Sequence, residues 1–219
     1  DCLLSRGLGD VYKRQLPAPG LRERKRQQTL DHLAQTAYRL FETLGYDAVT
    51  MEQIAAQANV SKGTLYNHFP VKEALLAHRF HTELAASAAE LLPALRAQPD
   101  FAKRLKRVLH ASAHWSESNR AYLGPYLRYR LSTLRADDVT EKSPRSGMQA
   151  LFEGLIAQGQ AAGQLRTDLS AERLAHQLQF LHLGALLRWL DLPGASLRKE
   201  FDALLSLFVQ GAAAPGNAP

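Results

Sequence analysis

The segment VSKGTLYNHFPVKEALL, residues 60–76, carries hydrogen-bond donors at most positions that its apolar residues leave free. Leu65 and Phe69 are spaced to anchor one face of a short helix to a core. A helix built only for packing does not need the hydroxyl, amide, imidazole and ammonium groups on its other side. Such groups suit the phosphate oxygens and base edges of nucleic acid.

The order of these residues fits a helix that reads DNA. In a helix-turn-helix protein the second helix lies in the major groove, and its N-terminal residues meet base edges. Gly63 lets the backbone approach closely, Lys62 can reach a guanine edge or a phosphate, and Asn67 can pair with adenine. The other donors suit phosphate oxygens, and the last of them also lies beside the positive end of the next helix: Thr64, Tyr66, His68 and Lys72.

Two short helices joined by a tight turn are predicted to position these groups. Thr50 is a typical N-cap, and Gln53 three residues later completes a capping box. Asn59 ends the first helix with a residue type that tolerates left-handed backbone. Ser61 then caps the second helix. This is the layout of a helix-turn-helix.

The rest of the chain is also predicted to be helical. Apolar residues from Leu30 to Leu44 follow one helical stripe, and Gly45 stands where a C-terminal cap belongs. A longer helix is expected from Lys72 to Pro93, with a start that frays because Val71 offers no polar cap. Further helices are expected at 100–116, 119–135, 146–162, 171–191 and 196–211. Without any period-two strand pattern, the predicted fold class is all-α.

The stretch YRLFETLGYDAVTMEQIAAQANVSKGTLYNHFPVKEALL resembles the DNA-binding domain of the tetracycline-repressor-like (TetR/AcrR) family of bacterial transcription regulators. The matching residues are Phe41, Gly45, Tyr46, Thr50, Ile54, Ala55, Val60, Ser61, Gly63, Thr64, Leu65, Tyr66, His68, Phe69, Lys72 and Glu73. The resemblance implies base contacts near Lys62, Gly63 and Asn67, and Thr50 is counted among the DNA-binding residues. It implies phosphate contacts at Thr64, Tyr66, His68 and Lys72. Asn59 replaces the glycine that is common in the turn.

The resemblance also implies a helical regulatory domain that binds a small-molecule effector and forms a homodimer through its last two helices. Apolar residues surround the segment 180–190 and give the last helix a full apolar face. The predicted interface residues are Leu183, Leu187, Phe201, Leu204, Leu205 and Phe208.

A polar and aromatic group in the middle of the regulatory domain is the candidate effector pocket. Its members are His114, Trp115, Tyr122, Tyr126, Tyr129 and Arg130, although such aromatics are more often core or surface anchors. Arg130 suits an anionic ligand. His110 and His114 are spaced like metal ligands, but no third ligand is evident, so no metal is predicted.

Composition excludes several other classes. The net charge of +6 is compatible with an acidic partner, and the single cysteine excludes a disulfide framework within one chain. No apolar run is long enough to span a bilayer and no signal peptide is recognisable, so we expect a soluble, cytoplasmic protein with no membrane partner. No catalytic motif occurs, so the chain is not expected to be an enzyme or to need a cofactor.

The predicted domains are a leader (1–21), a helix-turn-helix DNA-binding domain (22–70), a regulatory and dimerisation domain (71–211) and a tail (212–219). The leader segment DCLLSRGLGDVYKRQ resembles translated adapter sequence, and a natural disordered tail is the alternative. The basic run at 22–26 is either a solvated cluster or an arm that touches phosphates or the minor groove.

The predicted function is a sequence-specific transcription regulator, a ligand-responsive repressor that acts as a homodimer on an inverted-repeat operator in double-stranded DNA. An activator of the same family has the same sequence features. Two alternatives come from other classes. One is a non-specific architectural DNA-binding protein, and the other is a helical small-molecule-binding protein or enzyme whose DNA-binding head is vestigial.

Overall fold

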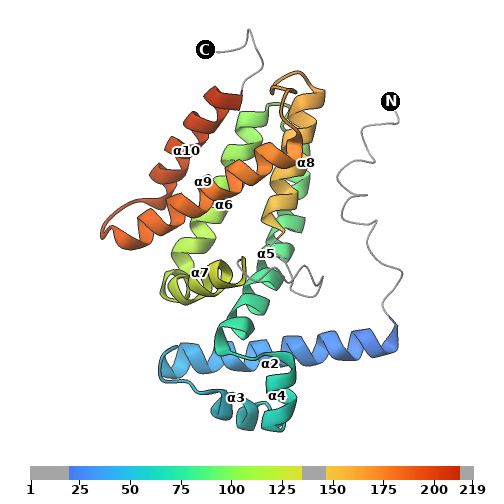
Figure 1. Ribbon diagram of the computed structural model, residues 1–219, viewed down its shortest axis with the longest axis vertical. Helices are drawn as coiled ribbons and strands as arrows, with labels where there is room; N and C mark the ends of the chain where they lie inside the picture. Colours follow the sequence, from blue (N-terminus) through green and yellow to red (C-terminus); the bar gives the residue numbers. More distant parts are fainter. Residues whose placement is uncertain (1–19, 135–146, 213–219) are drawn as a thin grey trace. The chain divides into compact units, whose positions relative to one another are not determined.

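The computed structural model describes residues 20–134 and 147–212, and in these ranges the chain forms α-helices and no strand (Figure 1). The all-α prediction is therefore confirmed. The helices are α2 (Leu21–Leu44), α3 (Met51–Gln57), α4 (Lys62–His68), α5 (Lys72–Arg96), α6 (Phe101–Ser118), α7 (Arg120–Leu134), α8 (Met148–Ala161), α9 (Ala171–Asp191) and α10 (Leu197–Ala212). No described helix combines the length and apolarity that crossing a membrane requires.

The chain divides into two compact units. Unit 1 comprises Asp1–Leu84 and Ala121–Arg145, and unit 2 comprises Ala85–Arg120 and Ser146–Pro219. Unit 1 thus joins α2, α3 and α4 to the first half of α5 and to α7. These units are defined by how densely their residues pack, whereas the domain boundary predicted near residue 70 divides the chain by function. That boundary stays a prediction. The predicted leader and tail fall almost entirely outside the described residues.

The predicted helix ends are close to the observed ones, except at the start of α2 and the end of α5. Helix α2 begins at Leu21, well before the apolar stripe that starts at Leu30. Pro93 was expected to stop α5, but this helix continues to Arg96 with the proline inside it. A proline costs the helix one N–H donor, while its carbonyl still accepts the amide of Ala97 at 3.2 Å. Leu95 is only 1% exposed, so the extra turn buries an apolar side chain that offsets the lost bond.

The core of unit 1 holds α2, α3 and α4 against α5 and α7. Its fully buried side chains come from each of the first four of these helices: Leu33, Phe41, Ile54, Leu65, Leu75, Leu76 and Phe80. Helix α7 joins them through aromatic pairs, with Tyr126 against Phe80 at 5.2 Å and Tyr122 against Tyr38 of α2 at 5.3 Å between ring centroids. One packed core therefore fixes the helix-turn-helix on α5 and α7.

The core of unit 2 encloses a histidine. His182 of α9 stacks on Phe201 with 4.8 Å between ring centroids, and its Nε2 is 2.9 Å from the hydroxyl oxygen of Ser112. Burial lowers the pKa of His182 to about 4, so the ring is neutral in the folded protein near pH 7. A neutral imidazole with a hydroxyl partner can be buried at modest cost.

Candidate DNA-binding surface

The caps of α3 and α4 form as the sequence predicts. The Oγ of Thr50 accepts the amide of Gln53 at 3.2 Å, and the side-chain oxygen of Gln53 accepts the amide of Thr50 at 2.8 Å, which completes the capping box. Asn59 adopts φ 55°, the left-handed conformation expected in the turn. The Oγ of Ser61 accepts the amide of Thr64 at 3.0 Å. The predicted helix-turn-helix is therefore present.

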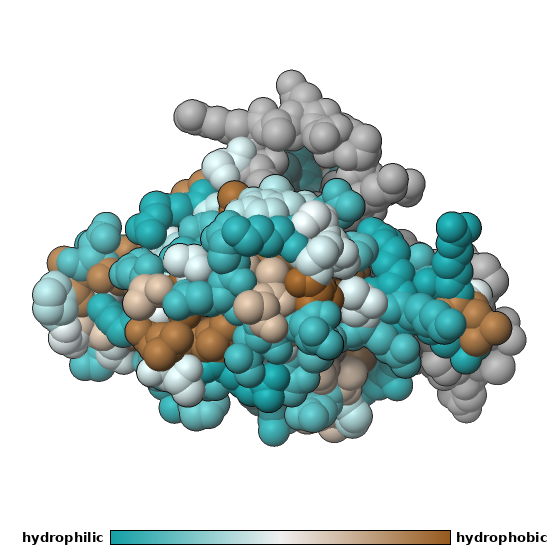
Figure 2. Space-filling view, turned by 90° about the horizontal axis from the view of Figure 1, so that it is seen from below, coloured by the Kyte–Doolittle hydropathy of each residue, from teal (hydrophilic) through white to brown (hydrophobic). Residues whose placement is uncertain are grey.

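Helix α4 buries one side and exposes donors on the other. Leu65 is 0% exposed and Phe69 is 5% exposed, as the apolar spacing predicts. Four of the predicted contact residues are exposed: Lys62, Gly63, Tyr66 and Asn67. The other two, Thr64 and His68, are half-buried. Viewed from below, the face that carries α3 and α4 is mostly hydrophilic (Figure 2). The structure thus gathers these six residues on one short, accessible helix.

Packing within the chain does not require a glycine at position 63. A Cβ built there would meet only the Oγ of Ser61, at 3.8 Å, which is ordinary van der Waals contact. The residue is helical and has a negative φ, so no special backbone conformation explains it either. Glycine also has a lower helix propensity than alanine. The missing side chain is therefore better explained by close approach of an external partner.

Glu52 is part of this surface, and the sequence pattern did not point to it. Its carboxylate lies 3.5 Å from the ammonium of Lys62, and both side chains are about half exposed or more. A backbone hydrogen bond in the first turn of α3, followed by Lys62, holds the pKa of Glu52 below its usual range. An acidic residue in the first turn of a helix normally indicates only a complement to the helix dipole. Its pairing with Lys62 depends on the tertiary arrangement of the two helices.

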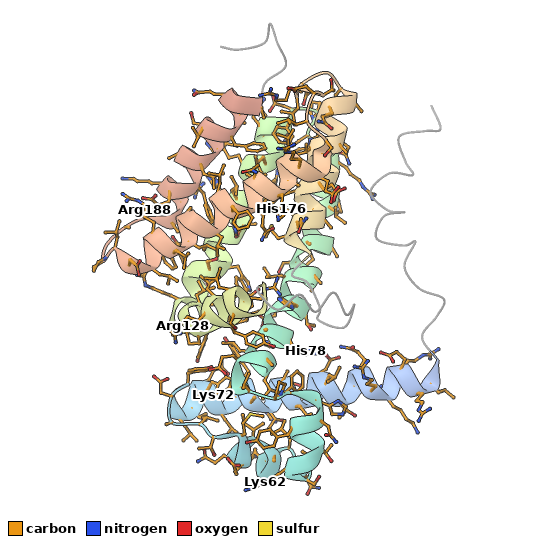
Figure 3. The ribbon with its side chains drawn as sticks, in the orientation of Figure 1. Lys62, Lys72, His78, Arg128, His176 and Arg188 are labelled. Atoms are coloured by element: carbon orange, nitrogen blue, oxygen red, sulfur yellow. The ribbon has the colours of Figure 1, made fainter. Side chains whose placement is uncertain are left out.

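Lys72 has a second environment in addition to the predicted one. Its ammonium donates to the carbonyls of Tyr46 at 2.8 Å and Val49 at 3.3 Å, with Asp47 more distant at 3.5 Å, and lies 4.3 Å from the centroid of the Tyr46 ring. In Figure 3, Lys62 lies at the outer end of α4, whereas Lys72 lies beside α2. The ammonium of Lys72 thus stabilises the turn after α2.

Contacts from α2 hold the helix-turn-helix in place. The ring of His32 donates to the carbonyl of Ala58, the last residue before the turn, at 3.3 Å. The ring of His78 on α5 contacts the carboxylate of Asp31 at 2.7 Å, and Tyr46 donates to Glu73 at 2.7 Å. These bonds join the end of α3, α2 and the start of α5.

The six residues predicted to line an effector pocket fall in different units. His114, which is exposed, and Trp115, which is half-buried, belong to unit 2. The other four belong to unit 1, where Tyr126 is buried and forms a 3.1 Å hydrogen bond with His81. The Nδ1 of His81 is buried with no partner in the described part of the chain. Burial lowers the pKa of His81 to about 4 and raises that of Tyr126 to about 12.

Three residues predicted at the dimer interface lie inside unit 2 instead. Phe201 is 0% exposed, and Leu204 and Phe208 are each 6% exposed within a single chain. They pack in the protomer core, because that face of α10 covers α6 and α9. Leu187 is exposed, and Leu183 and Leu205 are half-buried. Other apolar residues that the prediction did not include are more exposed: Phe180 on α9 and Leu207 on α10.

The histidine pair considered as metal ligands has other surroundings. The ring of His110 contacts the carboxylate of Asp202 at 2.8 Å, and His114 is exposed. Among the residues that the structure describes, no group of three or more metal-ligating side chains comes together.

Comparison with known proteins identifies the family. The pattern that defines bacterial regulatory proteins of the tetR family matches residues 33–78. The HTH-type transcriptional repressor DhaR of Mycobacterium sp. (strain GP1) is 30% identical over 162 residues, which cover 72% of this chain and 80% of DhaR. The chain belongs to the TetR family. It is therefore a transcriptional regulator.

Two further matches extend over nearly the whole length of the relative. The HTH-type transcriptional regulator BetI of Burkholderia ambifaria is 27% identical over 188 residues, 74% of this chain and 95% of BetI. The crystal structure of Thermus thermophilus FadR, a TetR family transcriptional repressor in complex with lauroyl-CoA, is 27% identical with a TM-score of 0.74. That match covers 87% of this chain and 98% of FadR. The likeness thus extends beyond residues 33–78 into the helices that follow.

Proposed function

We propose that this TetR-family chain is a ligand-responsive repressor that acts as a homodimer on an inverted-repeat operator. The observation that carries the proposal is the row of exposed donors on α4, held by a capping box, a left-handed turn and a buried anchor. The relatives named as repressors, DhaR and Thermus FadR, support repression. DNA as the partner places the protein in the bacterial cytoplasm.

In this proposal α4 lies in the major groove of the operator. Lys62 and Asn67 read base edges, and Gly63 lets the backbone approach the DNA. Lys62 leaves Glu52 to do so, at little cost because water screens this exposed ion pair. The remaining residues contact phosphates and fix the register of the helix: Thr64, Tyr66, His68 and Lys72, with Thr50 at the start of α3.

The second copy of the chain is proposed to cover the exposed apolar face of α9 and α10. Phe180 is 54% exposed and Leu207 is 62% exposed, and Leu187 lies further along α9. Gly184, between Phe180 and Leu187 on the same side, has no atom within 4 Å of its ideal Cβ, so a partner helix can approach closely there. Leu183 and Leu205 flank this face. In Figure 3 the labelled residues His176 and Arg188 mark the part of α9 that includes residues 180–187.

A small molecule is proposed to control DNA binding. The lauroyl-CoA bound by Thermus FadR supports an effector for this chain but does not name it. Tyr126 is the candidate contact best supported by the structure, because the unpaired Nδ1 of His81 lies in the same buried pair. An effector releases DNA only by binding the DNA-incompetent state more tightly. A coupling of about 1–3 kcal/mol would weaken DNA binding about 5- to 150-fold.

The proposal is tested by selecting bound duplexes from a random DNA pool with the chain from Leu21 onward. Two reading heads on a dimer should enrich an inverted repeat whose half-sites lie about one helical turn apart, or a multiple of it. Circular dichroism and the thermal transition of the same sample establish that it is folded. Failure of a folded dimer to enrich any sequence contradicts sequence-specific binding and favours the architectural or vestigial-head alternatives.

A further inference from the structure

The first two turns of α2 extend beyond the packed part of unit 1. Every residue from 21 to 28 is exposed, and the first buried residue of the helix is Leu33. At 1.5 Å per residue these turns, here called the α2 arm (residues 21–28), are about 12 Å long. Figure 1 shows α2 continuing past α4, and Figure 2 shows this end as largely hydrophilic. The arm has no apolar stripe that packing would explain.

The charges of the arm are unevenly distributed around the helix. Successive residues are about 100° apart, so Arg22 and Lys25 lie within about 80° of His32 and Leu33, which face the helix-turn-helix. Arg24 lies on the opposite side of the helix. Neither Arg22 nor Lys25 makes a side-chain hydrogen bond or ion pair within the described part of the chain. The side of the arm that continues toward the turn therefore carries free positive charge.

The inner end of the α2 arm, at residue 28, lies one turn of helix before the residues that contact the helix-turn-helix. His32, one turn of helix beyond the arm, donates to the carbonyl of Ala58, and Asp31 contacts His78 of α5. Two bonds to different elements thus hold α2 next to the inner end of the arm. Because the arm is itself helical, its cations keep a fixed direction relative to α4.

We propose that Arg22 and Lys25 contact DNA phosphates next to the groove that α4 enters, with Arg26 as a weaker contributor because it pairs with Glu23 at 3.3 Å. This inference rests on the proposed function. The major groove is about 12 Å wide, so a helix inside it has phosphates on both sides within reach of an arm of this length. Nucleic acid is the partner because the cationic side of the arm continues into the surface that carries α4.

The test compares two sides of one arm. Arg22→Gln/Lys25→Gln removes charge from the side that faces the helix-turn-helix, and Arg24→Gln is the control on the opposite side. Glutamine, lysine and arginine have similar helix propensities, so the arm stays helical and the thermal transition should not move. Binding to the selected operator and to a scrambled duplex is measured from 50 to 200 mM salt. The quantity compared is the slope of log K against log salt concentration.

For the double variant we expect the slope to become shallower by about 2 per bound chain, on both duplexes, because each phosphate contact contributes about 0.9. The slope of Arg24→Gln should change by less than half a unit. Unchanged slopes in all variants overturn the inference, and so does an equal change per charge on the two sides, since that reflects net charge alone. If the unaltered chain binds no duplex, the proposed function itself fails. Operator binding with unaltered slopes contradicts only the role of the arm.

Discussion

Helices α4 and α9 each bury one side and expose the other, yet their exposed sides differ in chemistry. On α4 the exposed groups are an ammonium, a phenol, an amide and a glycine backbone. On α9 they include Phe180 and Leu187, exposed by 54% and 37%. Apolar residues gathered on an exposed face indicate another apolar surface, whereas a row of donors indicates an anionic one. The exposed faces therefore fit the two proposed partners, DNA for α4 and a second copy of the chain for α9.

The largest effect is expected from breaking the apolar face. Phe180→Glu/Leu187→Glu should raise the dimer dissociation constant on the order of 10³-fold, because an unpaired buried charge costs about 3–5 kcal/mol. Tight operator binding should be lost with the dimer, as sedimentation velocity and DNA titration would show. Leu44→Glu/Leu131→Glu, at residues of unit 1 exposed by 52% and 38%, is the matched control and should remain dimeric. A dimer that survives the α9 change contradicts the assigned face.

Asn67→Ala tests whether the polar face of α4 reads sequence. The variant should lose about 1–3 kcal/mol on the selected operator and tolerate any base at one position of each half-site. Titration of the operator and its single-position substitutions measures this loss of preference. Equal weakening on all duplexes would show that Asn67 does not contact a base.

Variants of Lys72 and Lys62 distinguish a role in stabilising the helix-turn-helix from a role in contacting DNA. Lys72→Met removes a charged donor from the carbonyls after α2, and we expect the Tm to fall by about 5 °C. Lys62→Met breaks only an exposed ion pair and should change the Tm by less than about 2 °C. Each variant should make the salt slope shallower by about 1. An unchanged slope for Lys72→Met would restrict Lys72 to the fold.

The buried histidine of unit 2 predicts a pH dependence of stability. The folded pKa of His182 is about 4, below the value of about 6.5 in an unfolded chain. The unfolded state therefore takes up the proton first, and stability is lost as the pH falls from about 6.5 toward 4.

Between pH 7.5 and 5.5 this group should lower the free energy of unfolding by about 1 kcal/mol. Urea denaturation at the two pH values measures the change. His182→Gln should reduce the difference between them by that amount, and His114→Gln, at an exposed position, should leave it unchanged. The same pH dependence in His182→Gln and the unaltered chain would refute the assignment.

The helix-turn-helix was predictable because the sequence features that specify it are local. The Thr50–Gln53 capping box, the turn residue Asn59 and the cap Ser61 act within a few residues of each other, so their sequence order specifies their geometry. The contacts of Lys72 with the turn after α2, and of Glu52 with Lys62, join separate helices and left no local trace. Helical periodicity placed the ends of most helices within two residues.

The apolar face proposed for dimerisation was only partly predictable, because a helical stripe shows which residues are apolar but not what covers them. Helix α10 turns Phe201, Leu204 and Phe208 toward its own protomer and leaves Leu207 exposed. The proposed effector contacts were harder still to predict from the sequence, since isolated tyrosines follow no spacing rule. Tyr122 packs on α2 and Tyr126 bonds to α5 within unit 1, contacts that depend on the packing of α7.

The most direct test of the two-partner account is the mass of the complex with the selected operator, measured by native mass spectrometry. The account predicts two chains per duplex on the inverted repeat and no stable complex of that stoichiometry on a scrambled duplex. One chain per operator would contradict the role of the α9 face. Equal occupancy of the two duplexes would contradict sequence reading by α4.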